Sequence, residues 1–427
     1  MMMSCCCATE NVFENSLHYS SPAHGGWGVL KMGHLIPESY TLFVSPAACG
    51  RHGALAARME NRKNRVSYLF LSEDDIVSGG YEDLLIQAVE KLIKHLEKCH
   101  KVPKVLTLFV SCIDDLLGTD HDALINELSG IYPHIRFIFC HMNPTSTDTG
   151  VPPAVNIQNK NYSLLDVTKE RDGGVNIIGN LAPLRANGEL FQMLKDMEVS
   201  EIRHISDYDT FAGYQEMAKS CLNMVVTPTG KYASAQMEKK HGIPYEMALT
   251  SFQTECIKDT YQKIAKQLGK TCPEVSAYEK EAKEVLKKTA EALNGMPVII
   301  DGEAIVRPFD LAKALLQAGI NVQCVFEQKL LPSDKENYQW VMEHYPDMTI
   351  LQPQNPKVTV LEKFQGECLS IGYSAAYITG AKHVVDIAGQ HGLYGYQGII
   401  DLANMMEKAA KETADLKKLL DEAVIVV

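Results

Sequence analysis

Short apolar runs alternate with amphipathic helical stretches along most of this chain. The first block contains four strand-like runs, at 40–44, 66–71, 105–110 and 135–140, with helical patterns between them. Two parallel strands must be joined by a crossover of a dozen or more residues, which is usually a helix. The alternation therefore predicts parallel α/β layers rather than a β-sandwich or a helical bundle.

The chain is longer than one hydrophobic core usually organises. Its 427 residues predict two or three domains of roughly 100–200 residues each. A loop at 142–156, rich in Pro, Thr, Ser and Gly, ends the first block, and charged helices at 254–294 end the second. We expect three Rossmann-like domains, at 1–165, 166–294 and 295–427, each with a mainly parallel sheet flanked by helices.

Acidic side chains outnumber basic ones. With 41 basic and 53 acidic residues the formal net charge is −12, which argues against a nucleic-acid-binding surface because such a surface needs a basic stripe. No run approaches the roughly 20 apolar residues of a membrane helix, and the N-terminus lacks the pattern of a signal peptide. We therefore expect a soluble cytoplasmic protein with neither a nucleic acid nor a membrane as partner.

Two of the twelve cysteines are candidate metal ligands. Cytosolic reductants keep thiols reduced, so free thiols and metal ligands are expected rather than a disulfide framework. Cys49 and Cys112 each follow a strand-like run, and a thiolate at the mouth of a parallel sheet can reach a metal cluster without distorting the core. Cys5, Cys6 and Cys7 fit a disordered terminus better, and whether one of them folds back as a ligand stays open.

Three histidines lie in glycine-rich surroundings. His24 belongs to Ala23–Gly28 (AHGGWG), where a metal ligand and a surface turn are equally good interpretations. His383 and His391 lie within residues 382–395, whose density of Gly, His and Tyr is typical of a pocket lining. The chain has no Walker A loop, no Gly-x-Gly-x-x-Gly, no Cys-x-x-Cys, no His-Glu-x-x-His and no Gly-x-Ser-x-Gly. Nucleotide binding, zinc catalysis and serine hydrolysis are therefore unsupported.

The motifs around the two cysteines resemble one known family. Cys49 is followed by Gly50, residues 73–80 read EDDIVSGG, and Cys112 is followed by LGTD at 117–120. This spacing resembles the component 1 subunits of nitrogenase and its relatives. Weaker echoes lie at 222–245 and at 302–308, so that the resemblance covers the chain from about residue 24 to residue 405.

The resemblance implies a three-domain α/β subunit that pairs with itself or with a sister subunit. It implies an iron–sulfur cluster at that interface and electrons from a separate ATP-dependent iron–sulfur reductase protein. The family's cluster ligands carry over to Cys49 and Cys112, whereas Ala23 or His24 occupies the place of the first cysteine. Since a [4Fe–4S] cluster needs four outer ligands, the cluster is expected to bridge two subunits that supply two thiolates each.

The large nitrogenase cofactor is not expected in its usual binding mode. Val226, Thr227 and Pro228 stand where the family's anchoring cysteine would lie, although His383 matches the cofactor-binding histidine, three residues before Asp386. The resemblance thus implies reduction of an organic substrate, either a tetrapyrrole or a sulfur compound, rather than of dinitrogen. His24, His383 and His391 would be proton donors or axial ligands, and a second metal or tetrapyrrole site stays undefined.

Two other functions remain open at this point. The first is a cofactor-assembly scaffold that holds a maturing metal cluster and passes it on without turnover. The second is an α/β binding protein without any cluster. The sequence names neither the substrate nor the partner subunit.

Overall fold

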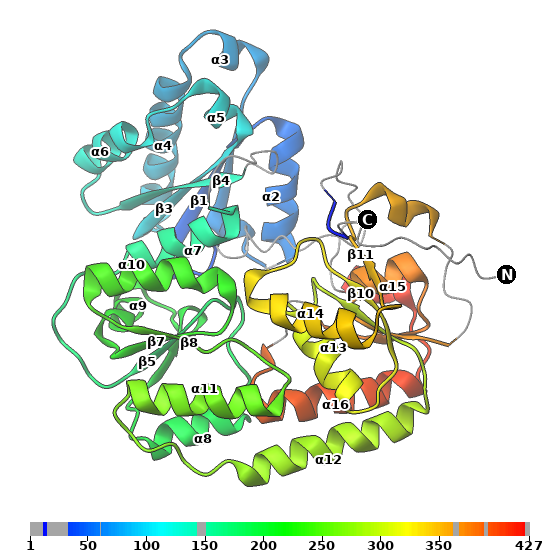
Figure 1. The fold of residues 1–427 in the computed structure, drawn as a ribbon. Coiled ribbons are helices and arrows are strands. Elements are labelled where there is room, and N and C mark those ends of the chain that lie inside the picture. Colours follow the sequence, from blue (N-terminus) through cyan, green and yellow to red (C-terminus); the bar gives the residue numbers. More distant parts are fainter. Residues whose placement is uncertain are drawn as a thin grey trace. The chain divides into compact units, whose positions relative to one another are not determined.

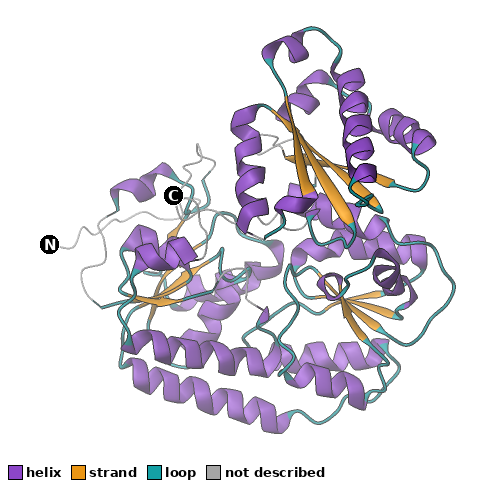
Figure 2. Ribbon diagram, turned by 180° about the vertical axis from the view of Figure 1, so that it is seen from behind, coloured by secondary structure: helices purple, strands orange, loops and turns teal. Residues whose placement is uncertain are grey.

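The computed structural model describes residues 12–14, 33–59, 61–142, 151–361, 367–387 and 392–422. Within them lie three sheets whose paired strands are all parallel. Helices flank each sheet (Figures 1 and 2). The predicted α/β class with parallel, Rossmann-like sheets is therefore confirmed.

The first sheet has the strand order β2-β1-β3-β4. Every residue of its two central strands is buried, as expected for a parallel sheet that is covered on both faces. Its elements are β1 (Ser39–Ser45), α2 (Ala47–Met59), β2 (Val66–Phe70), α3 (Glu73–Val77), α4 (Tyr81–Lys98), β3 (Val105–Ser111), α5 (Cys112–Leu117), α6 (His121–Ile131) and β4 (Arg136–Met142).

Helix α4 shows why the predicted pattern folds in this way. Leu85, Val89, Leu92, Ile93 and Leu96 recur at helical spacing and are all buried, so that one apolar stripe packs against the sheet. They belong to a core that also contains Leu106 and Leu108 of β3. The charged residues of α4 occupy the remaining, solvated face of the helix.

The second sheet has the strand order β6-β5-β7-β8. Its elements are β5 (Val175–Ile178), β6 (Ile202–His204), α9 (Phe211–Tyr214), β7 (Leu222–Val225), α10 (Lys231–His241) and β8 (Tyr245–Met247), preceded by α7 (Pro153–Ser163). Helix α7 contacts both β4 and α10. One hydrophobic core therefore continues from Phe43 of β1 through Ile157 of α7 to Ile178 of β5.

The third sheet has five strands in the order β11-β10-β9-β12-β13. The elements in and around it are α8 (Glu189–Asp196), α11 (Thr254–Gln267), α12 (Ser276–Leu293), β9 (Val298–Asp301), α13 (Pro308–Gln317), β10 (Val322–Phe326), α14 (Lys335–His344), β11 (Thr349–Leu351), β12 (Leu369–Ile371), α15 (Tyr373–Thr379), β13 (His383–Val385), α16 (Gly395–Lys411) and α17 (Leu416–Glu422). Helix α16 packs along α12 and also contacts α8 (Figure 1).

The chain forms two compact units. Unit 1 comprises Met1–Gly26, Leu184–Met197 and Ala248–Val427, and unit 2 comprises Trp27–Pro183 and Glu198–Met247. Each of the three predicted domains contains one sheet, but unit 2 holds the first two sheets on their shared core. Helices α8, α11 and α12, which the sequence grouped with the middle block, belong to unit 1 with the third sheet. Within the described residues, no helix is long and apolar enough to cross a membrane.

Candidate functional site

Cys49 and Cys112 lie after neighbouring strands of the first sheet. The chain passes from β1 to β2 on one side and then returns to β3 on the other side of β1. Such a reversal opens a crevice at the carboxyl ends of the two strands, where open α/β sheets bind their ligands. Cys49 is in the first turn of α2, and Cys112 is the first residue of α5. Both cysteines are half-buried and free of disulfides.

The strand register brings the residues before these helices to the same level. Val44 of β1 pairs with Val110 of β3, so the next residues, Ser45 and Ser111, end the two strands side by side. Both hydroxyls are buried, at 1% and 2% exposure, and neither has a hydrogen-bond partner among the residues that the structure describes. Buried polar groups are nearly always paired, so this edge offers two unused donors beside two thiols.

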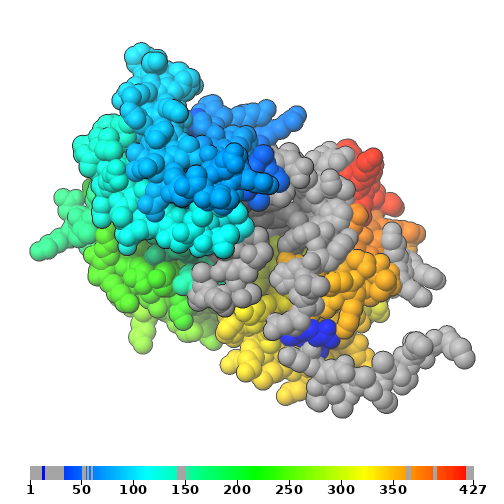
Figure 3. Space-filling model, turned by 90° about the horizontal axis from the view of Figure 1, so that it is seen from above, coloured from blue at the N-terminus to red at the C-terminus, as the bar shows by residue number. Residues whose placement is uncertain are grey.

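Gly50 is required by close packing next to Cys49. A Cβ at this position would lie 2.7 Å from Cε1 of Phe70 and 3.1 Å from Oγ of Ser45. A larger residue here would require the ring of Phe70, which is 54% exposed, or the side chain of Ser45 to move. Helices α3 and α5 lie at the same edge of the sheet (Figure 1), and this edge faces the viewer in Figure 3.

A group of polar side chains lies at the same edge, beyond Cys112. Asp114, His121 and His141 form the one group of three or more His, Cys, Asp and Glu residues, within the described segments, whose ligand atoms are close enough to hold a metal ion. Burial would raise the pKa of Asp114, but His121, Tyr81 and His141 together hold it below its ordinary value. The buried carboxylate is therefore charged at neutral pH.

At the corresponding position of the second sheet, the residues that follow the two strands pack directly against each other. The chain order reverses between β5 and β7, where Gly179 and Thr227 follow the strands. A Cβ on Gly179, whose φ is +116°, would lie 2.5 Å from Oγ1 of Thr227. Gln158 Nε2 donates to the carbonyl of Gly179 (3.1 Å) and to Oγ1 of Thr229 (3.0 Å). This is the region where the resemblance lacks its anchoring cysteine, and Gly179 is in close contact with Thr227 here.

The crevice of the third sheet is filled by a carboxyl group. Here the order reverses between β9 and β12, and Asp301 at the end of β9 accepts hydrogen bonds from the backbone N–H groups of Glu303 (3.0 Å) and Ala375 (3.1 Å). Burial, reinforced by the charge of Glu303, raises the pKa of Asp301. Gly372 approaches so closely that a Cβ there would lie 2.7 Å from that of Asp301.

His383 occupies the opposite end of its strand from these crevices. It is the first residue of β13 and is 5% exposed. Its Nδ1 lies 2.9 Å from the carbonyl of Ala409 and 2.8 Å from that of Glu412, and its Nε2 lies 2.5 Å from Oε2 of Glu367. Burial lowers the pKa of His383, but Glu367 and the two carbonyls bring it above its ordinary value.

With both ring nitrogens occupied, His383 links β13 to the C-terminal end of α16. Its role as a proton donor or axial ligand stays a prediction, and this geometry favours a structural role. His24, His391 and the cysteines at 5–7 lie outside the described residues. The structure therefore brings together Cys49 and Cys112 at one sheet edge and places His383 elsewhere.

The sequence interpretation missed Asp114, His121 and His141. Each lies just before or after a predicted element: Asp114 follows Cys112, His121 begins the helix predicted from Asp120, and His141 follows the strand predicted to end at Cys140. The sequence does show polar residues near the ends of two consecutive strands. They predict a common site only once β3 and β4 are known to be neighbours in the sheet.

Three parallel α/β sheets with a cysteine pair at the first crevice define a Rossmann-like α/β protein with a candidate cluster site. The model of the nitrogenase component 1 type oxidoreductase family matches residues 26–411. The chain belongs to this family, as the resemblance predicted. A comparison with proteins of curated function finds no significant match.

Two solved structures are similar to the chain in fold. One, described as "Nitrogenase Cp1 at pH 6.5", is 16% identical, with a TM-score of 0.70 over 93% of this chain and 94% of that chain. Another, described as "Nitrogenase Cp1 at pH 5", is also 16% identical, with a TM-score of 0.58 over 92% of this chain and 90% of that chain. At this identity the similarity establishes the shared fold.

Proposed function

We propose that this chain is the iron–sulfur catalytic-component subunit of a nitrogenase-like reductase. Cys49 and Cys112 supply two thiolate ligands to a [4Fe–4S] cluster, and a second subunit, identical or related, supplies the other two. Members of the family bind iron–sulfur clusters and work with a second subunit and a reductase component. When bound, the cluster supplies low-potential electrons to the substrate.

The observation that carries this proposal is the placement of the two thiols. They follow adjacent strands at the chain reversal of the first sheet, where a ligand is expected. The hydroxyls of Ser45 and Ser111, which have no partner in the described part of the chain, can donate hydrogen bonds to cluster sulfides. Such bonds tune the reduction potential of a cluster. The donor set therefore fits an iron–sulfur cluster, with two of its four thiolates coming from one chain.

The substrate proposed is an organic molecule, a tetrapyrrole or a sulfur compound, with electrons from an ATP-dependent iron–sulfur reductase partner. Two features of the second sheet support a departure from dinitrogen. Val226, Thr227 and Pro228 stand in place of the anchoring thiol, and Gly179 packs closely against Thr227 beside them. The same close contact leaves less room at the ends of β5 and β7 for a large cofactor, and we therefore prefer the reductase to the assembly scaffold.

Anaerobic metal analysis tests the cluster. The protein, expressed with its genomic neighbours and purified without oxygen, is expected to contain about four iron atoms per pair of chains. The reduced protein should give the paramagnetic resonance signal of a [4Fe–4S]⁺ cluster. Cys49→Ser and Cys112→Ser should each lose most of the iron, because a cubane with too few thiolates is unstable.

Cys99→Ser is the matched control. Cys99 is an exposed thiol at the end of α4, which lies beside the N-terminal rather than the carboxyl end of the strands. This variant should keep both iron and signal. Iron-free wild-type protein with a normal circular dichroism spectrum would refute the proposal, as would iron that survives both Cys49→Ser and Cys112→Ser.

A further inference from the structure

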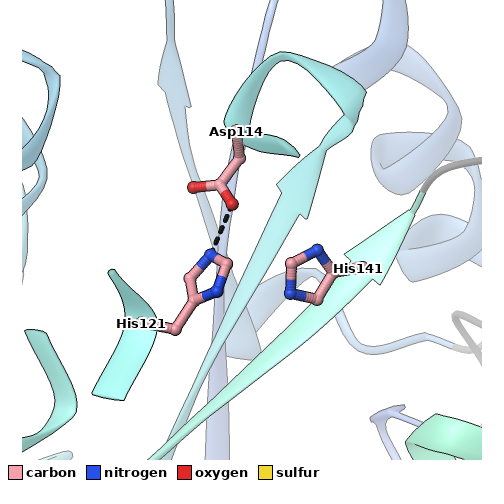
Figure 4. A group of neighbouring side chains, drawn as sticks. All are labelled: Asp114, His121 and His141. Atoms are coloured by element: carbon pink, nitrogen blue, oxygen red, sulfur yellow. Dashed lines mark hydrogen bonds and ion pairs between the residues drawn. The ribbon is translucent and has the colours of Figure 1, made fainter. Parts of the chain in front are cut away.

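Three potential metal ligands come together at the carboxyl ends of β3 and β4. Asp114 is in α5, His121 is the first residue of α6, and His141 is the next-to-last residue of β4 (Figure 4). One ligand atom from each lies within 4.8 Å of the others. The imidazoles of His121 and His141 lie edge to face, with ring centroids 4.6 Å apart and an interplanar angle of 86°.

Hydrogen bonds to one another and to two neighbouring side chains hold these three residues in place. Asp114 Oδ1 accepts from the hydroxyl of Tyr81 (2.8 Å), and its Oδ2 lies 2.5 Å from Nε2 of His121. Nδ1 of His141 lies 3.0 Å from Oδ1 of Asp115. Asp115 thus holds one ring nitrogen of His141, which fixes the tautomer and leaves Nε2 of His141 available to a metal. Nε2 of His121 and Oδ2 of Asp114 face each other, so both atoms can bind an ion that enters between them.

Charge and access also suit a cation. Asp114 is 1% exposed, whereas the side chains of His121 and His141 are 24% and 27% exposed. The buried end of the group is thus anionic, and the open end admits an ion from solvent. The carboxylates of Asp114 and Asp115 lie beside two imidazoles, which are neutral when they bind a metal. The site is therefore negatively charged, and a divalent ion would compensate this charge.

We propose that Asp114, His121 and His141 bind one divalent first-row transition metal ion. Two imidazole nitrogens and one carboxylate oxygen are a ligand set typical of mononuclear Fe²⁺ and Zn²⁺ sites that keep positions open for water or substrate. The ion takes the place of the proton between His121 and Asp114, which is released on binding. This site uses no cysteine and is independent of the iron–sulfur proposal.

Cobalt(II) titration of the chelator-treated full-length protein tests the site. Wild-type protein is expected to bind one equivalent with visible d–d bands but without the thiolate-to-cobalt charge-transfer bands of a cysteine site. His121→Ala and His141→Ala should each weaken this binding at least 10-fold. Asp115→Ala should weaken it by about 10- to 100-fold, because His141 loses the carboxylate that holds its Nδ1.

His134→Ala is the matched control, because His134 is an exposed histidine in the loop before β4. It should bind cobalt as wild type does. Circular dichroism and thermal unfolding of each metal-free variant separate lost affinity from lost folding. The proposal is overturned if wild type binds no more cobalt than well-folded His141→Ala, or if the bound cobalt shows thiolate bands that persist in both histidine variants.

Discussion

At the scale of single residues, an unusual titratable group of unit 2 is the buried imidazole of His241. This residue ends α10 and is 5% exposed, and neither ring nitrogen has a hydrogen bond within the described residues. Burial, together with the charges of Lys240 and Arg171, lowers the pKa of His241 to about 4. The imidazole is therefore neutral in the folded state at pH 7.

His241 should make unit 2 sensitive to acid. A histidine with a lowered folded-state pKa contributes stability that is fully present above its ordinary pKa, near 6.5, and is lost as pH falls toward 4. The free energy of unfolding, measured with urea, should therefore fall between pH 7 and pH 4.5 by about 1 to 2 kcal/mol more for wild type than for His241→Leu. The exposed control, His134→Leu, should behave as wild type. Equal losses in wild type and His241→Leu would contradict this assignment.

At the scale of elements, one buried carboxylate holds the N-terminus of α16. Glu189 of α8 accepts hydrogen bonds from the backbone N–H groups of Tyr396 (2.6 Å) and Gln397 (3.0 Å) and from the hydroxyl of Tyr261 (2.6 Å). Gly395 has a φ of +66°, and a Cβ there would overlap both Glu189 and Tyr261. Anions are favourable at a helix N-terminus, so this contact joins α8 to the third sheet's unit.

Removal of this carboxylate should destabilise unit 1. Glu189→Ala leaves three buried donors without an acceptor and is expected to lower the free energy of unfolding by about 2 to 4 kcal/mol. Gly395→Ala should destabilise unit 1 to a similar extent, because alanine disfavours the positive φ at this position and its Cβ would overlap Glu189 and Tyr261. Glu281→Ala, an exposed substitution on α12, should stay within about 0.5 kcal/mol. If denaturant unfolding of Glu189→Ala also shows a decrease of only about 0.5 kcal/mol in the free energy of unfolding, Glu189 does not stabilise the N-terminus of α16.

At the scale of the whole molecule, two buried carboxyl groups of unit 1 have raised pKa values, whereas an aspartate and a histidine of unit 2 have lowered ones. In unit 1, burial raises the pKa of Glu327 to about 8 and that of Asp334 to about 6. In unit 2, a hydrogen bond from Arg203 is the largest influence on Asp172 and lowers its pKa. The pKa of His241 is lowered as well, so both groups make unit 2 less stable as the pH falls. Acid should therefore affect the two units differently.

As the pH is lowered from 8 to 5.5, the midpoint of thermal unfolding of unit 1 should rise. Carboxyl groups with raised pKa values contribute stability that is present below their ordinary range, near 4, and is lost as pH rises through 6 to 8. In Trp27→Phe, the fluorescence of Trp340 in α14 reports on unit 1 alone. Its midpoint should increase by about 2 to 4 °C for each kcal/mol gained, and Glu327→Gln should reduce this increase. A midpoint that falls over this range would contradict the prediction.

Much of the fold followed from local pattern. The strand-like runs at 40–44 and 105–110 became β1 and β3, and the cysteines predicted to follow strands do follow them. The assignment of α8 to unit 1 could not be predicted, because it depends on Glu189 meeting Tyr396, which is 207 residues away. Local spacing contains no information about such a contact.

By itself, the sequence determined the α/β class and the family, because buried strands, crossover helices and cysteine spacing are local properties of the chain. Tertiary structure alone decided which strands are neighbours. The order β2-β1-β3-β4 places Cys49 and Cys112 at one crevice and brings Asp114, His121 and His141 within reach of one ion. The physical reason is that strand order is set by how the helices cover both faces of the sheet, and this packing involves residues that are distant in the sequence.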